Sequence, residues 1–171
     1  MQHVRKITPC LWFDGQAEEA AALYTAIFRN SRIVEVSRYG EAGREVHGQT
    51  PGTAMAVAFE LDGQSFTALN GGAAFKFNEA ISFQVHCETQ EEVDYYWEKL
   101  SKGGDPRAQQ CGWLKDRYGL SWQVVPKRLL ELLIDSQSAG SKRAMEAMLT
   151  MKKIDITTIE RAHAGKSTVA T

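Results

Sequence analysis

The stretch "AISFQVHCETQEEVDYYWEKLSKGG", residues 80–104, decides the fold, because a strand pattern passes directly into a helix pattern. Two sets of side chains alternate at its start: Ser82, Gln84 and His86 on one face, and Phe83, Val85 and Cys87 on the other. A period of two is typical of a half-buried strand. Residues 88–102 contain no proline and end at Gly103-Gly104, which is typical of a helix and its C-terminal end. We therefore expect a strand with one wet face, followed by a helix.

The first half of the chain repeats this order. Residues 7–13 are expected to form a strand and residues 14–28 an alanine-rich helix, with Asp14 as its N-cap. An apolar stripe at helical spacing consists of Ala20, Leu23 and Ile27, with Tyr24 and Phe28 beside it. The two expected helices share Gln16/Gln90 and Glu18/Glu92 at a constant offset. This slight identity favours two copies of one module.

The remaining strands complete each module. Residues 31–39 alternate as a strand, and residues 40–52 read as a flexible loop. Residues 53–61 and 64–70 predict a hairpin, because Asp62-Gly63 suits a type I′ turn. Two further strands are expected at 109–116 and 120–126, with a turn at 117–119. The fold class is therefore α+β, with tandem βαβββ modules at about 1–75 and 76–135.

The tail differs in kind. Residues 136–141 read as a linker at the start of a tail that runs to residue 171. Helical spacing over "KRAMEAMLTMKK" places Ala144, Met145, Met148 and Met151 in one stripe, and Asp155 is a plausible cap for a second short helix. Because Ile154 and Ile156 add to this apolar area, we expect the tail helices, 141–164, to cover a sheet edge or a partner subunit in a homodimer.

Composition limits the partners. The formal net charge is -1, so no global field favours nucleic acid or an anionic membrane. No stretch approaches 18 apolar residues, which predicts no membrane span. Three widely spaced cysteines without a CxxC pair favour reduced thiols and a cytoplasmic location.

Several stretches resemble a known family. Residues 7–28, 77–104, 119–126 and 147–156 are similar to the PhnB-like branch of the vicinal oxygen chelate superfamily, which includes glyoxalase, bleomycin resistance proteins and dioxygenases. The resemblance implies paired βαβββ modules whose sheets curl around a cavity, and homodimers whose cavities include residues of both chains. Members often carry the label demethylubiquinone methyltransferase, which would imply methyl transfer. We expect none, since neither Gly71-Gly72 nor Gly103-Gly104 forms the glycine-rich turn between strand and helix that holds such a cofactor.

The resemblance also implies a divalent metal held by His, Glu or Gln from strands of both modules. The family's ligand positions fall here on Gln123, near Thr8, and at Ala80 or Ser82, none of which is a strong ligand. His86 lies near the end of its strand, whereas the family's metal ligand comes near the start of that strand. We therefore expect no metal and no cofactor, unless Gln123, Glu79 and His86 converge.

Strand alternation names the candidate pocket: Thr8, Cys10, Trp12, Ser82, Gln84, His86, Ser121 and Gln123. Cys87 is expected under the helix as a small apolar residue, whereas Cys10 looks into the cavity. The leading interpretation is a protein that binds an unknown small molecule. One alternative is a metal-dependent lyase, isomerase or dioxygenase acting on vicinal oxygens, and another is a resistance-type protein that sequesters a drug. The same positions could also simply fill the interior of the sheets.

Overall fold

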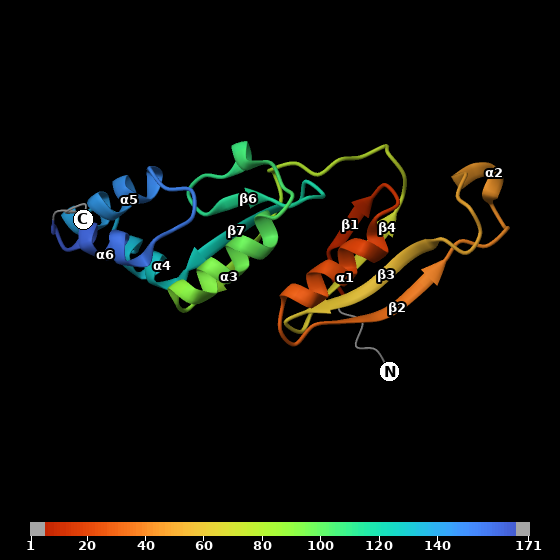
Figure 1. Ribbon diagram of the computed structural model, residues 1–171, viewed down its shortest axis with the longest axis horizontal. Helices are drawn as coiled ribbons and strands as arrows, with labels where there is room; N and C mark the ends of the chain where they lie inside the picture. Colours follow the sequence, from red (N-terminus) through yellow and green to blue (C-terminus); the bar gives the residue numbers. More distant parts are fainter. Residues whose placement is uncertain (1–5, 167–171) are drawn as a thin grey trace. The chain divides into compact units, whose positions relative to one another are not determined.

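A computed structural model describes residues 6–166 of the 171-residue chain. The chain divides into two compact units, of which the first ends at Lys76 and the second begins at Phe77. Each unit contains one sheet with a long helix packed on it (Figure 1). Among the described residues, no helix combines the length and apolar character that crossing a membrane requires.

The first unit is a complete βαβββ module. Its elements are β1 (Cys10–Phe13), α1 (Ala17–Ile27), β2 (Arg32–Arg38), β3 (Ala54–Leu61) and β4 (Gln64–Asn70). The sheet order is β1-β4-β3-β2, with β1 parallel to β4 and the other neighbours antiparallel. Asp62 and Gly63 have φ angles of 45° and 75°, so the type I′ turn predicted between β3 and β4 is confirmed.

Helix α1 packs closely because its buried face is made largely of alanines. The buried residues are Ala17, Ala20, Ala21, Tyr24 and Ile27, whereas Leu23 of the expected stripe is only half-buried. The prediction that Asp14 caps this helix is wrong. The N-cap is Gln16, whose side chain makes no capping bond, and the buried Asn70 of β4 accepts a hydrogen bond from the Ala17 amide at 2.9 Å. Asn70 also donates to the Ala54 carbonyl at 2.9 Å, which ties the start of the helix to the sheet.

The segment between β2 and β3 is partly helical. The expected loop, 40–52, contains the short helix α2 (Arg44–His47) between Gly43 and Gly48, which both have positive φ. In Figure 1, α2 lies beyond the ends of β2 and β3. The ring of His47 packs against Tyr39 at a centroid distance of 4.5 Å, so the segment has a defined local structure.

The second unit contains a shorter copy of the module. Its elements are β5 (Ser82–Cys87), α3 (Gln90–Ser101), the 3-10 helix η1 (Pro106–Ala108), β6 (Trp113–Lys115) and β7 (Ser121–Pro126). The sheet order is β5-β7-β6, with β5 parallel to β7. The strand expected at 109–116 is thus shortened to β6, with one isolated bridge between Gln110 and Trp113. Cys111 and Gly112 both have positive φ, which interrupts an extended strand at that point.

Three helices follow β7. They are α4 (Lys127–Leu133), which sequence reasoning missed, α5 (Ala139–Leu149) and α6 (Ile156–His163). The predicted Asp155 cap is confirmed, since its carboxylate accepts from the Thr158 amide at 2.6 Å. These helices share a small core formed by Leu129, Leu132, Ile154 and Ile159, with Leu133, Met148 and Met151 against it. Residues 167–171 of the expected tail lie outside the described residues.

The chain between α5 and α6 docks onto the second unit through its backbone. The amides of Cys111 and Gly112 donate to the carbonyls of Met151 and Lys152, both at 2.8 Å. The Gln90 side chain donates to the Ile154 carbonyl at 3.2 Å and accepts from the Ile156 amide at 2.8 Å. The tail helices are therefore part of the second unit.

Candidate functional site

The face of the second sheet opposite α3 carries five of the candidate residues. Val85 and Cys87 are buried on the α3 side, while Gln84 and His86 are exposed on the other. The register places Ser82 beside Ser121 and Gln84 beside Gln123, so these four side chains share the face away from the helix. The alternation expected from the sequence is present in β5.

A hydrogen-bonded row of polar side chains crosses this face. The Gln123 amide nitrogen donates to the Ser82 hydroxyl at 2.8 Å, and the Gln84 amide nitrogen donates to the Gln123 amide oxygen at 3.2 Å. The row leaves the Gln84 oxygen, one Gln84 N–H and the Ser82 hydroxyl proton available. These groups can bind a ligand that both donates and accepts hydrogen bonds.

Ser121 stands out next to this row. It is 1% exposed, and its hydroxyl has no hydrogen-bond partner among the described residues. A buried hydroxyl without a partner costs about 1–3 kcal/mol, so native proteins usually satisfy such a group. A bound molecule or a water that reaches Ser121 would remove this cost.

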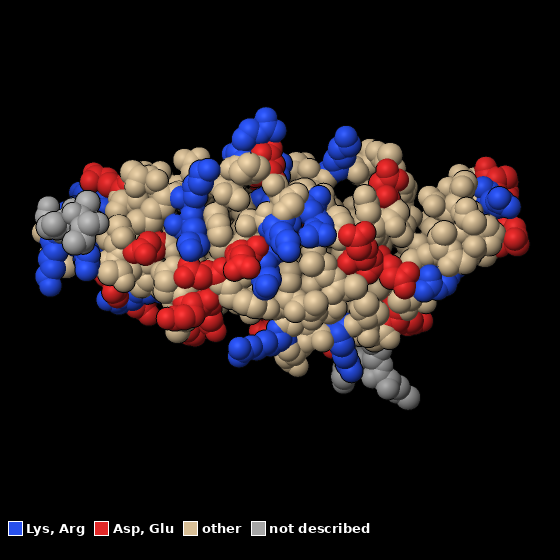
Figure 2. Space-filling view, in the orientation of Figure 1, with Lys and Arg blue, Asp and Glu red and all other residues tan. Residues whose placement is uncertain are grey.

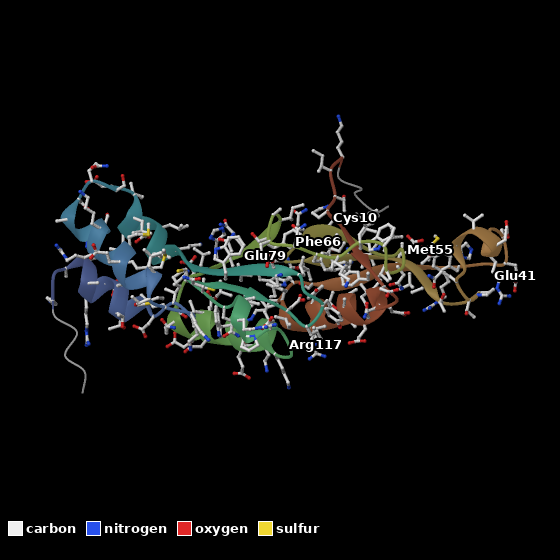
Figure 3. All side chains as sticks on the ribbon, turned by 90° about the horizontal axis from the view of Figure 1, so that it is seen from above. Cys10, Glu41, Met55, Phe66, Glu79 and Arg117 are labelled. Atoms are coloured by element: carbon white, nitrogen blue, oxygen red, sulfur yellow. The ribbon has the colours of Figure 1, made fainter. Side chains whose placement is uncertain are left out.

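Strand β6 adds two residues to the face that sequence reasoning missed. Trp113 lies opposite Gln123, and Lys115 lies opposite Ser121. Lys115 forms a hydrogen-bonded ion pair with Glu79, which is labelled in Figure 3. The hydrogen bond from Lys115 lowers the pKa of the Glu79 carboxyl. The sequence shows that Trp113 and Lys115 alternate along a strand, but only the register of β6 against β7 shows that they lie beside Gln123 and Ser121.

The other three candidates, Thr8, Cys10 and Trp12, belong to the first unit. Cys10 (labelled in Figure 3) is exposed at the start of β1, and partial desolvation raises the pKa of its thiol. The register places Thr67 beside Cys10 and Leu69 beside Trp12, two β4 residues that the sequence analysis did not name. Thr8 precedes the strand and is half-buried.

The Trp12 ring is held by the loop that follows β4. Its indole nitrogen donates to the Gly72 carbonyl at 2.7 Å, and its ring meets Phe75 edge-on at a centroid distance of 4.9 Å. A Cβ atom at Gly71 would lie 2.1 Å from the ring. Trp12 is thus fixed in place, with its donor already used, and its remaining contribution to a ligand is apolar surface.

Cys87 has the environment of a core residue. Its side chain is fully buried, and desolvation, with a contribution from Glu92, raises the pKa of its thiol to about 12. Because the thiolate is the reactive form, this group is not a nucleophile at neutral pH.

The residues present do not fit a divalent metal. Among residues 6–166, no group of three or more His, Cys, Asp or Glu side chains lies close enough to hold an ion. Gln123 is hydrogen-bonded to Ser82 and Gln84, and Glu79 is paired with Lys115, so the convergence with His86 that a site would need is not formed. The groups available on this face are hydrogen-bond donors and acceptors.

Charges of both signs are mixed on the surface. Lys and Arg lie beside Asp and Glu over the face shown in Figure 2. This arrangement agrees with the net charge of -1 and provides no broad basic surface on that side.

Comparisons with known proteins identify the family. The family described as 3-demethylubiquinone-9 3-methyltransferase matches residues 5–125. A PhnB protein from Bacillus cereus, titled a putative 3-demethylubiquinone-9 3-methyltransferase, is 39% identical with a TM-score of 0.61, and the match covers 71% of this chain and 99% of that one. The resemblance expected for residues 147–156 lies beyond the family match.

More distant solved structures show the fold alone. PA1353 from Pseudomonas aeruginosa is 18% identical with a TM-score of 0.55, covering 72% of this chain and 98% of that one. The fosfomycin resistance protein FosX from Listeria monocytogenes is 15% identical with a TM-score of 0.50, covering 76% and 97%. No curated protein matches the sequence significantly. The chain therefore belongs to the PhnB-like family described as 3-demethylubiquinone-9 3-methyltransferase.

Proposed function

We propose that this protein binds a small organic molecule on the face of the second sheet that lies opposite α3, without a divalent metal. The observation that carries the proposal is the polar row of Ser82, Gln123 and Gln84 beside the buried, unpartnered hydroxyl of Ser121. A few placed polar groups with apolar surface around them are typical of small-molecule sites. In the first unit, the sheet face opposite α1 carries Cys10 and Trp12 and is proposed as a binding face of its own.

The family description names methyl transfer, but neither glycine pair of this chain forms the glycine-rich loop that would hold a methyltransferase cofactor. Gly71 leaves room for the Trp12 ring, and a Cβ at Gly104 would lie 1.9 Å from the Lys115 carbonyl. Both glycines are thus explained by close packing within their own unit. Neither lies in a turn between a strand and the N-terminus of a helix, where a glycine-rich cofactor loop would be.

A thermal-shift screen of metabolites and antibiotics tests the proposal. A true ligand should raise the melting temperature of the native protein, and the shift should shrink in Gln84→Ala and Gln123→Ala. Gln137→Ala is the matched control, since Gln137 lies in the exposed chain between α4 and α5 and belongs to no strand. A ligand whose shift is the same in all variants would contradict the assignment of the face.

Metal analysis separates the alternatives. We expect protein purified without chelator to contain no stoichiometric metal. One ion per chain, lost in Gln123→Ala, would instead favour a metal-dependent lyase, isomerase or dioxygenase. Among ligands found in the screen, turnover would identify an enzyme, and an antibiotic bound without turnover would identify a sequestering protein.

We also propose that the protein is a cytoplasmic homodimer. Three free cysteines suit a reducing compartment. The helices that follow β7 and the chain between them expose the apolar residues Leu130, Ile134, Met145 and Leu149, which a second copy could cover. A stable interface of this kind buries on the order of 2,000 Å² or more. Light scattering should give twice the chain mass, and a concentration-independent monomer would contradict the dimer.

A further inference from the structure

Helices α4 and α6 and the chain just after α6 form a cavity that is open to solvent and to which no strand contributes a residue. It has a volume of about 450 Å³ and is lined by Arg128, Leu132, Thr157, Glu160, Arg161, His163, Ala164 and Lys166. These residues come from α4, α6 and the chain just after α6 (α4 and α6 are labelled in Figure 1). Small-molecule sites typically measure about 300–1,000 Å³, so the volume suffices for a small organic ligand. The cavity lies beyond residue 125, where the family match ends.

The lining has an excess of positive charge. Arg128 is neutralised by Glu131 at 2.8 Å and by Glu160 at 2.7 Å. Arg161 and Lys166 line the same cavity, and neither has a carboxylate partner within residues 6–166. Two uncompensated cations at one cavity suit an anion with about two negative charges, which is the charge of a phosphomonoester at neutral pH.

The end of α6 is arranged so that an anion is tolerated there. Helix C-termini normally repel anions, because their last carbonyls are unpaired. Here Arg143 of α5 donates to the carbonyls of Ala162 at 2.8 Å and His163 at 2.6 Å. The His163 ring is seated against Gly140, where a Cβ atom would lie 2.8 Å from it. Arg143 therefore covers the negative end of the helix, and the ring of His163 has a fixed place in the wall.

The rest of the lining is suited to the organic part of the ligand. Leu132 is buried and Ala164 adds a methyl group, while Thr157 provides a hydroxyl. The Arg128–Glu160 pair links α4 to α6, and both residues line the cavity. We propose that this cavity binds a small phosphomonoester, with the phosphate held by Arg161 and Lys166 and the apolar group packed towards Leu132.

Phenyl phosphate is a suitable probe, with inorganic phosphate and phenol as comparisons. Isothermal titration of the full chain should give saturable binding of phenyl phosphate, weaker binding of inorganic phosphate and none of phenol. Amide NMR signals of Thr157, Arg161 and Ala164 should shift during the titration. Equal affinities for phenyl phosphate and inorganic phosphate would overturn the assignment of an organic phosphate.

A pair of charge-matched variants locates the site. Arg161→Gln/Lys166→Gln should weaken phenyl phosphate binding by about tenfold or more, since both charge-assisted contacts are lost. Lys142→Gln/Lys152→Gln removes the same charge from exposed positions outside the lining and should leave the affinity unchanged. Equal losses in both double variants, or NMR shifts confined to residues 82–86 and 121–123, would overturn the proposal. The second result would leave the proposed function of the sheet faces intact.

Discussion

At the scale of single residues, the structure explains features whose function was ambiguous in the sequence. Only glycine fits at positions 71 and 104, because a Cβ atom there would overlap the Trp12 ring at Gly71 and the Lys115 carbonyl at Gly104. Cys87 is a thiol in the core, although it neighbours the exposed His86. These residues are determined by packing in their own units, so their presence carries no information about catalysis.

The contact between Gly71 and Trp12 predicts a strong effect of one methyl group. Gly71→Ala should destabilise the protein by about 1–3 kcal/mol, because the new Cβ overlaps the ring and overpacked sites must distort. Gly40→Ala is the control, since a Cβ there meets no atom within 4 Å. Denaturant unfolding measures both changes. Adding Trp12→Leu to Gly71→Ala should recover part of the loss, and equal costs at the two glycines would contradict this account.

The burial of Cys87 predicts its reactivity. Its pKa is raised to about 12, so we expect no modification by a thiol reagent at pH 8 in the native state. Cys10 is exposed and should react under the same conditions. Mass spectrometry after labelling identifies the modified residues. Modification of Cys87 at the rate seen in denatured protein would contradict its place in the core.

At the scale of elements, the features that depend on neighbouring residues could be predicted from the sequence, whereas those that depend on distant residues could not. Alternation and the Asp62-Gly63 signal were sufficient for the hairpin, and Asp155 for the start of α6. The cap of α1 could not be predicted, because Asn70 is 53 residues away from the amide it binds. Helix α4 had a readable signal, since Leu129, Leu132 and Leu133 follow Pro126 at helical spacing.

The residues of the candidate site likewise fall into those that the sequence predicted and those that only the tertiary structure shows. Residue alternation predicted the wet face of β5 and the buried position of Cys87. It could not predict that Trp113 and Lys115 join that face, because the register of β6 against β7 is a tertiary property. The unpartnered hydroxyl of Ser121 likewise became apparent only from the packing around it.

The Gln90 side chain joins α3 to the tail and should matter for stability. Gln90→Ala would leave the Ile154 carbonyl and the Ile156 amide without this partner, at a cost of about 1–3 kcal/mol. Gln137→Ala removes a glutamine whose side chain makes only a 3.5 Å contact with Ser136, and should change stability little. Urea unfolding of the two variants makes the comparison. Equal stability of the Gln90→Ala and Gln137→Ala variants would show that the two hydrogen bonds of the Gln90 side chain contribute nothing.

The ion pair between α3 and the tail predicts a response to acid. The hydrogen bond from Lys153 lowers the pKa of Asp94 from its ordinary value, so the folded state favours the charged carboxylate. A lowered acidic pKa contributes stability above the ordinary value, and this contribution is lost as the pH falls through the lowered pKa. Solvent screening keeps the effect small. Asp94→Asn should be less stable than the native protein at pH 6, and the difference should close as the pH falls through the lowered pKa of Asp94. A difference that stays constant with pH would contradict the pairing.

At the scale of the whole molecule, the two units are unequal. The first completes its module with four strands, whereas the second has three strands and adds three helices. Cys111 and Gly112, at the point where the second module lacks a strand, bind the carbonyls of Met151 and Lys152 instead. The tail therefore supplies hydrogen-bond partners that a further strand would otherwise provide.

Removing α5 and α6 should therefore affect the second unit selectively. A chain that ends at Ser136 loses the partners of Cys111, Gly112 and Gln90 and exposes Leu129 and Leu132. We expect its second unit to lose amide-exchange protection while β1 to β4 keep theirs. Light scattering on the same chain tests whether the tail also holds the proposed dimer together. Unchanged protection of residues 82–126 would contradict this role of the tail.

The docking of residues 151–154 also has a consequence for the order of events during synthesis. Every partner needed by the first sheet has left the ribosome soon after Lys76, so that unit can fold while translation continues. The second sheet has to wait for residues 151–156 before Cys111, Gly112 and Gln90 find their partners. A ribosome that stalls between these points would hold a folded first unit joined to an incomplete second one. That nascent chain is the state in which we expect chaperones to meet this protein.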